Sequence, residues 1–223
     1  MSKQTLPLDE QVIPLLPGNT APDFVLAGTQ KARVSLAGLR GHRVVLVFYP
    51  LDGELITREQ LSLFQANLRQ ISQFDALVFG ISVDPVSNHE AFARELGLDF
   101  SLLSDSDPKG AVSRLYGVYR EGMELSARAL FVVDGRRIIW FSEAYPDSVN
   151  PGVDSILSTL ATIAEADKLA SESDPSLTAL EAETDQAQKS TEAMVVLIAG
   201  FATALTIALI FLVYVVLSVA HLA

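Results

Sequence analysis

Cysteine is absent from all 223 residues of this sequence. Because the thiolate is the form that ligates metals and attacks peroxides, its absence excludes disulfides, thiolate metal sites and every catalytic cycle that runs through the protein's own thiol. Histidine is scarce as well, with three residues in the chain. The His, Asp and Glu residues show no spacing typical of metal ligands. We therefore expect no metal and no cofactor.

Positive charge is also in short supply. The chain has 16 Lys and Arg against 27 Asp and Glu, which gives a net charge of −11. It contains neither a basic patch nor a glycine-rich loop of the kind that cradles phosphates. Nucleic acid carries dense negative charge, so an acidic chain of this kind binds it poorly. We expect no nucleic-acid partner.

Charge disappears completely from residues 193–220, whereas the N-terminus lacks the apolar run of a signal peptide. As a helix, 28 residues extend roughly 42 Å, enough to cross a hydrocarbon core of about 30 Å. The sequence therefore predicts a tail-anchored, single-pass membrane protein. Lys168 and Lys189 precede the span and no Lys or Arg follows it, which favours a cytoplasmic location for the large N-terminal domain.

A stripe of small residues lies within the predicted transmembrane helix, at Gly200, Thr203, Ala204 and Ala208. Such a stripe lets a second helix approach closely, so integral membrane subunits are predicted as partners. Residues 166–192 are predicted to form an acidic linker, and one alternative is that this linker is helical and continues into the membrane. An acidic segment beside a membrane is repelled by anionic lipid headgroups, so it is expected to hold the domain off the surface unless a basic partner receives it. The alternative is a solvated spacer.

Apolar runs and turn residues alternate through the rest of the chain and predict an α/β fold. A strand is expected at 44–49, and Thr57 with Gln60 predicts a capping box that starts a helix near Thr57. A helix from His89 to Leu96 is expected at the surface, with His89 opening it and Gly97 ending it. The other expected elements, in chain order, are a strand and turn at 34–39, strands at 76–83 and 101–103, a helix at 111–115, a hairpin of 129–133 with 137–141, and a helix at 153–164.

Several short motifs resemble those of the peroxiredoxins, the AhpC/TSA branch of the thioredoxin-like proteins. They are Gly-Asn-Thr-Ala-Pro-Asp-Phe-Val-Leu at 18–26, Phe-Tyr-Pro at 48–50 and Ile-Ser-Val-Asp at 81–84. The resemblance implies a thioredoxin-like domain over residues 18–165, with a central mixed sheet covered by helices. Residues 1–17, which contain three prolines, are expected to form an extended N-terminal arm that lies on the domain or on a partner.

The resemblance also implies where a catalytic site would lie. The family has a Thr four residues after the Pro of Phe-Tyr-Pro and the peroxidatic Cys seven residues after it, and these positions hold Glu54 and Thr57 here. Tyr49 and Pro50 are retained, and Arg128 matches the family's arginine. Threonine is a poor nucleophile without an adjacent base, so we interpret these five residues as a vestigial site. We predict that Glu54 pairs with Arg128, against the alternative that Glu54 is a solvent-facing loop residue.

The function expected from these features is that of a non-catalytic, peroxiredoxin-like accessory or scaffolding subunit of a membrane complex, with respiratory and photosynthetic electron transport as the settings considered. A homodimer is a further candidate assembly. The first alternative is a membrane-anchored antioxidant oxidoreductase, as family assignment implies. The second is a binding module in which the pocket around Tyr49, Pro50, Thr57 and Arg128 captures a small anion or redox ligand at a helix N-terminus.

Overall fold

The protein is described here from a computed structural model, which describes residues 12–173. The chain divides into two units, Met1–Ala166 and Asp167–Ala223, and the sheet belongs to the first. Three predicted features fall outside the described residues. These are the first eleven residues of the N-terminal arm, the linker after Ser173, and the span 193–220 with Gly200, Thr203, Ala204 and Ala208.

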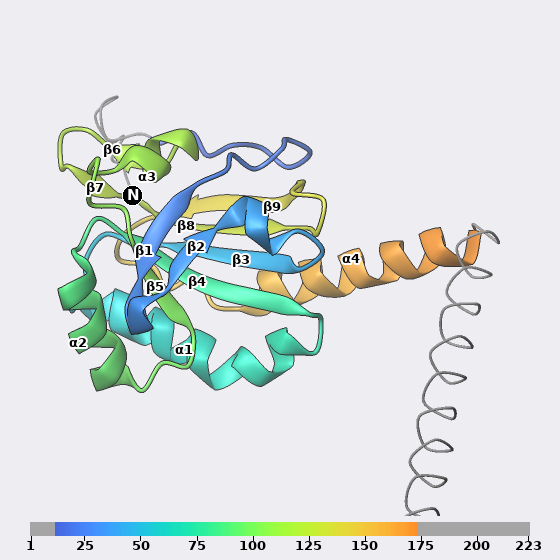
Figure 1. The fold of residues 1–223 in the computed structure, drawn as a ribbon, viewed down its shortest axis with the longest axis horizontal. Helices are drawn as coiled ribbons and strands as arrows, with labels where there is room; N and C mark the ends of the chain where they lie inside the picture. The colour runs from blue at the N-terminus through green and yellow to red at the C-terminus, as the bar shows by residue number, and fades with distance from the viewer. Residues whose placement is uncertain (1–11, 174–223) are drawn as a thin grey trace, which may run out of the picture. The chain divides into compact units, whose positions relative to one another are not determined.

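A seven-stranded mixed sheet forms the centre of the domain, in the order β2-β1-β5-β4-β3-β8-β9 (Figure 1). Its strands are β1 (Val25–Gly28), β2 (Arg33–Ser35), β3 (Arg43–Phe48), β4 (Ala76–Ser82), β5 (Ser101–Ser104), β8 (Arg128–Val133) and β9 (Ile139–Tyr145). β3 runs parallel to β4 and antiparallel to β8, so it lies in the middle of the sheet with neighbours on both sides. The short strands β6 (Tyr119–Arg120) and β7 (Leu125–Ser126) pair separately.

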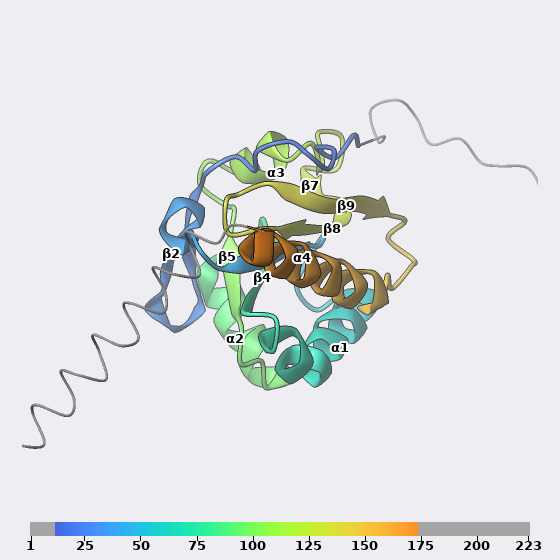
Figure 2. The ribbon, with the colours of Figure 1, turned by 90° about the vertical axis from the view of Figure 1, so that its right-hand side faces the viewer.

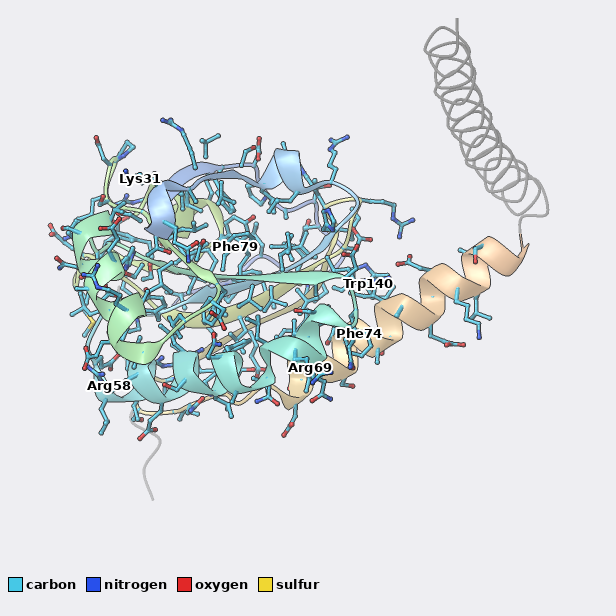
Figure 3. All side chains as sticks on the ribbon, turned by 60° about the horizontal axis from the view of Figure 1, so that its bottom comes forward. Lys31, Arg58, Arg69, Phe74, Phe79 and Trp140 are labelled. Carbon is cyan, nitrogen blue, oxygen red and sulfur yellow. The ribbon has the colours of Figure 1, made fainter. Side chains whose placement is uncertain are left out.

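Helices cover both faces of this sheet (Figure 2). They are α1 (Leu55–Ser72), α2 (Val86–Leu96), α3 (Ala111–Leu115) and α4 (Asp154–Ser173), with short 3-10 turns η2 (Thr29–Lys31) and η3 (Leu36–Leu39). The hydrophobic core consists of two clusters. Residues of α1, α2 and α4 pack with strand residues in the first cluster, and Val112 of α3 packs with strand residues in the second. Phe74 and Trp140 are partly buried against the first cluster, at the same end of the domain (Figure 3). Strand residues alternate between the two clusters because successive side chains point to opposite faces.

The α/β class, the mixed sheet and the hairpin around Asp134 are confirmed. The second hairpin strand, predicted at 137–141, is β9 at Ile139–Tyr145, and the predicted strand and turn at 34–39 is β2 followed by η3. Three helix boundaries also differ from the prediction. α1 begins at Leu55 instead of Thr57, because the backbone of Glu54 is extended and already serves as its N-cap. α2 begins at Val86, after Pro85. α4 continues to Ser173, beyond the predicted end at 164 and into the predicted linker. The sequence analysis predicts neither β6 nor β7.

The described part of the N-terminal arm lies against the domain. The backbone N–H of Leu15 donates to the carbonyl oxygen of Tyr116 (3.1 Å). Gly117 follows with a φ of +71°, and a Cβ placed there would come within 2.1 Å of the carbonyl oxygen of Ile13. Glycine therefore both permits the backbone turn and leaves space for the arm. This contact favours the first of the two predicted positions for the arm, on its own domain.

Candidate functional site

The candidate site lies where the end of β3 meets the start of α1 and the first residue of β8. Tyr49 and Pro50 continue β3 and are buried, and a short loop then leads to Glu54 and α1. β8 pairs antiparallel with β3, with Ala129 opposite Phe48. Arg128, one residue earlier in β8, is therefore placed beside the loop that follows β3. This pairing joins residues that are more than 70 positions apart in the sequence.

Arg128 is fully buried. Its guanidinium contacts the loop between β3 and α1 and the first turns of α1. Its Nη2 donates to Glu54 Oε2 at 2.9 Å and lies 3.4 Å from Thr57 Oγ1. Its Nη1 donates to the side-chain oxygen of Gln60. The Thr57 hydroxyl donates to Glu54 Oε2 at 2.8 Å. The Glu54 carboxylate thus accepts from both neighbours, and the predicted Glu54–Arg128 ion pair is confirmed.

The Glu54 side chain is 33% exposed, so the alternative of a freely solvated loop residue is wrong. Burial lowers the pKa of the Arg128 guanidinium, and the carboxylates of Glu54 and Asp147 act in the opposite direction. A buried cation that lost its anion would bear a large desolvation cost. Glu54 therefore supplies the charge that makes the burial of Arg128 tolerable.

A second ion pair adjoins the first. Arg120 Nη1 donates to Asp147 Oδ2 at 2.7 Å, and the backbone carbonyl of Asp147 accepts from Arg128 Nη2 at 3.3 Å. Sequence reasoning identifies neither Arg120 nor Asp147, because both come from segments that only the folded chain brings to this point. Gln60 is also missed as a site residue. Its side chain binds Arg128 instead of completing a capping box with Thr57, so the predicted box is wrong.

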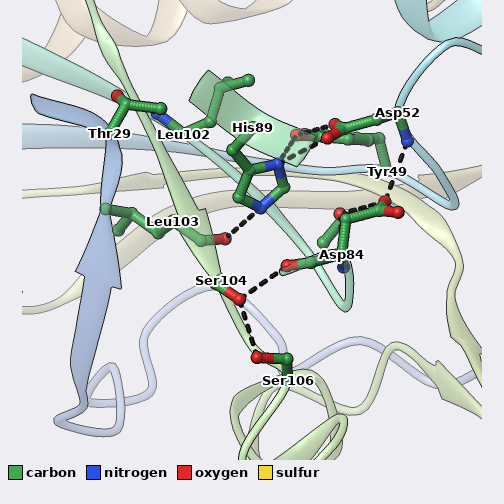
Figure 4. Close-up of polar contacts among 10 residues, drawn as sticks. Thr29, Tyr49, Asp52, Asp84, His89, Leu102, Leu103, Ser104 and Ser106 are labelled. Atoms are coloured by element: carbon green, nitrogen blue, oxygen red, sulfur yellow. Dashed lines mark hydrogen bonds and ion pairs between the residues drawn. The ribbon is translucent and has the colours of Figure 1, made fainter. Parts of the chain in front are cut away.

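The structure brings together Glu54, Thr57 and Arg128 from the predicted set, with Pro50 buried at the end of β3. Tyr49 is buried too, but its hydroxyl donates to Asp52 (2.9 Å) and belongs to a different network (Figure 4). Within the described residues, the hydrogen-bond partners of Thr57 Oγ1 are Glu54 and Arg128, and no histidine is among them. The Thr57 hydroxyl therefore contacts a carboxylate and a guanidinium, without an imidazole base in this part of the chain.

The predicted position of His89, at the start of a surface helix, is wrong. His89 is fully buried within α2, and its Nδ1 lies 2.8 Å from Asp52 Oδ2. The spacing of three residues between His89 and the buried Phe92 puts both on the inward face of α2, and this is the signal that the sequence offered.

Metal binding has no candidate cluster in the part of the chain that the structure describes. Within residues 12–173, no group of three or more His, Asp or Glu side chains could hold a metal ion. The expectation that the protein uses no metal and no cofactor stays a prediction, because it concerns the whole chain.

Comparison with known proteins identifies the family to which this site belongs. Residues 17–142, more than half of the chain, match the AhpC/TSA family model. The chain is a member of the AhpC/TSA family. Its similarity to alkyl hydroperoxide reductase E of Mycobacterium bovis is 41% identity over 127 residues, 56% of this chain and 83% of that protein. Chloroplastic peroxiredoxin Q of Triticum aestivum is 33% identical over 129 residues, 56% of this chain and 57% of the relative.

A solved relative agrees with the fold. The crystal structure of peroxidoxin BcpB from Mycobacterium tuberculosis is 30% identical, with a TM-score of 0.60 over 66% of this chain and 97% of that one. The thioredoxin-like peroxiredoxin fold predicted from the motifs is thereby confirmed. The chain is thus an AhpC/TSA member without cysteine, and the assignment of Glu54, Thr57 and Arg128 to the family's site positions stays a prediction.

The predicted localisation, a single-pass membrane protein with a cytoplasmic domain, is corrected by two findings. In residues 12–173 no helix is long and apolar enough to cross a membrane. The matched relatives are named as a hydroperoxide reductase and a chloroplastic peroxiredoxin, and neither name refers to a membrane. The assignment to a membrane is therefore not kept, and the span on which it rested lies outside the described residues.

Proposed function

We propose that this chain is a peroxiredoxin-fold protein without peroxidase activity of its own, and that it acts as an accessory or scaffolding subunit of a larger assembly. The observation that carries the proposal is the Glu54–Arg128 ion pair in a chain without cysteine. An arginine that would stabilise a thiolate instead binds a carboxylate. The chemistry is lost while the fold around it stays packed, which is consistent with selection for shape rather than for turnover.

The contacts of Arg128 support a structural role for these residues. Arg128 contacts four groups from three segments. They are Glu54 in the loop before α1, Thr57 and Gln60 on α1, and the backbone carbonyl of Asp147 in the loop after β9. A catalytic arginine must keep a donor available for the reacting atoms. Here the terminal guanidinium nitrogens are engaged by the protein itself, and such a network rigidifies the junction of α1 with β8.

Peroxide consumption tests the absence of catalysis. The whole chain, mixed with hydrogen peroxide or an alkyl hydroperoxide and a thiol reductant, is expected to consume peroxide no faster than the reductant alone, because no side chain can form a sulfenic acid intermediate. A rate that rises in proportion to protein concentration would overturn the proposal. Heat-denatured protein serves as the blank for trace metals.

The accessory role needs its own measurement. Native mass spectrometry of the tagged protein, drawn from its own cell, is expected to show stoichiometric recovery with other polypeptides. Recovery of the chain alone would contradict the accessory role, and recovery as a homodimer would assign the scaffold to self-association. The predicted partners, integral membrane subunits contacted through Gly200, Thr203, Ala204 and Ala208, stay a prediction.

Antioxidant oxidoreductase activity is the second candidate, and membership of the AhpC/TSA family favours it. Without a cysteine the chain would have to work through the thiol of a partner. The peroxide assay distinguishes this candidate when it is repeated with the co-purified assembly: a rate that appears only there assigns the chemistry to the partner.

A small-anion binding module is the third candidate. Among residues 12–173, the Nε of Arg128 and the Nε2 of Gln60 are buried donors for which no hydrogen-bond partner is found, which is unusual in a folded protein. A rise in melting temperature with sulfate or acetate that Arg128→Ala abolishes would favour this candidate over the accessory role.

A further inference from the structure

A second buried polar network is centred on His89 (Figure 4), and it includes Asp52, two residues before Glu54. His89 sits on α2 with no exposed surface. Its Nδ1 lies 2.8 Å from Asp52 Oδ2, in the loop after β3, and its Nε2 lies 3.2 Å from the carbonyl oxygen of Leu103 on β5. One imidazole therefore joins a helix, a loop and a strand.

The partners of the ring determine where its protons are. A carbonyl oxygen only accepts hydrogen bonds, so Nε2 must carry a proton to bind Leu103. The contact of 2.8 Å between Nδ1 and Asp52 Oδ2 needs a proton as well, because two bare acceptors would repel each other at that distance. The Tyr49 hydroxyl donates to Asp52 Oδ1 at 2.9 Å, which favours the ionised carboxylate. The proton between them therefore belongs to the ring.

The surrounding charges favour the same state. Asp84 Oδ2 accepts from the backbone N–H of Asp52 at 2.9 Å and from the Ser82 hydroxyl at 2.8 Å, so a second carboxylate stands close to the first. Burial and the Asp52 carboxylate raise the pKa of Tyr49, which keeps this phenol neutral. The ring itself contacts the Asp52 carboxylate, the Tyr49 hydroxyl (3.4 Å from Nδ1) and the Leu103 carbonyl, and Asp84 binds the backbone of Asp52.

We propose that His89 is held as a buried imidazolium and is a positioning residue: by binding Asp52 it fixes the loop that places Glu54 against Arg128. Asp52 precedes Glu54 by two residues, and the intervening Gly53 has a φ of +79° with open space around its Cα. A glycine of this kind gives the loop freedom that must be removed elsewhere. The bonds of Asp52 to His89, Tyr49 and Asp84 remove it. This inference concerns the geometry of the site and does not depend on the accessory role.

The protonation state is measured directly by the ¹⁵N chemical shifts of the imidazole rings in the whole chain at neutral pH. Both nitrogens of His89 are expected at the positions of protonated nitrogens, with the signals assigned by their loss in His89→Gln. His42 is the internal comparison, because its Nδ1 contacts Asp75 at 3.1 Å while 49% of the His42 side chain is exposed. One unprotonated nitrogen in the ring of His89 would overturn the proposal, independently of the results obtained with the variants.

The positioning role is measured with Asp52→Asn, which keeps the size of the side chain and removes its charge. The ring of His89 is expected to return to one bare nitrogen, and the amides of Gly53–Ile56 to exchange with solvent about tenfold faster, since the loop opens more often. Asp75→Asn is the matched control and should leave these amides unchanged. Unchanged exchange in Asp52→Asn would overturn the positioning role, and so would a ring of His89 that stays doubly protonated.

Discussion

A double variant, Glu54→Thr with Thr57→Cys, is expected to react with hydrogen peroxide roughly a hundredfold faster than Thr57→Cys alone, since a neighbouring charge shifts a thiol's pKa by about two units. Thr57 Oγ1 lies 2.8 Å from the Glu54 carboxylate and 3.4 Å from Arg128 Nη2. In the single variant the carboxylate opposes formation of a thiolate. In the double variant the carboxylate is gone and the guanidinium faces the introduced sulfur.

The chemistry of that variant is the ordinary attack of a thiolate on the peroxide bond. The sulfur becomes a sulfenic acid, the other oxygen leaves as hydroxide or alkoxide and takes up a proton, and an added thiol reductant returns the sulfur to the thiol. Single-turnover loss of the thiol gives the rate, and alkylation by iodoacetamide as a function of pH gives the thiolate fraction. The control is Glu54→Thr with Thr57→Ser, which has no thiol and should consume no peroxide.

Two outcomes of this experiment would contradict the interpretation of these residues as a vestigial site. Equal rates in the single and double variants would show that Glu54 does not govern the electrostatics at position 57. A double variant that is as slow as a free thiol in solution would show that the pocket around Arg128 no longer supports peroxide chemistry, and the five residues would not form a vestigial site at all.

Local patterns in the sequence predicted the elements that surround the site. The apolar run before Pro50 predicted β3, and the residues Asp134-Gly135 predicted the hairpin of β8 and β9. These signals are short-range, because they come from alternation and from turn chemistry. The N-terminus of α1 was placed two residues late because a hydroxyl three residues before a glutamine was interpreted as a cap. In the structure both side chains are drawn to Arg128 instead.

The contents of the site were predicted only in part, and the reason lies in sequence separation. The family resemblance pointed to Glu54, Thr57 and Arg128. The cost of an unpaired buried arginine then predicted that Glu54 pairs with Arg128. No local pattern relates Gln60 to Arg128, or Asp147 to Arg120, because these contacts form only when β8 lies beside β3 and the following loop folds back. His89 was misplaced for the same reason. Its partners, Asp52 and Leu103, are 37 and 14 residues away.

Replacement of Arg128 is expected to show how strongly the domain depends on this network. Arg128→Ala should lower the free energy of unfolding by about 3–5 kcal/mol, since it leaves polar partners unpaired and opens a cavity where a large buried side chain stood. Glu54→Ala should cost less, about 2 kcal/mol, because Glu54 is one-third exposed and water can reach the guanidinium that it uncovers. Urea denaturation of the whole chain provides both values.

The Arg128 experiment has a matched control in Arg136, which pairs with Asp134 at 3.2 Å but has a side chain that is 75% exposed. Arg136→Ala should cost less than about 1 kcal/mol, as exposed ion pairs do. The double variant Glu54→Gln with Arg128→Met should cost less than the sum of its single changes, since a neutral pair of similar volume leaves no buried charge behind. If Arg128→Ala costs no more than Arg136→Ala, the ion pair with Glu54 does not stabilise the fold, and the structural role that we assign to the former catalytic position is wrong.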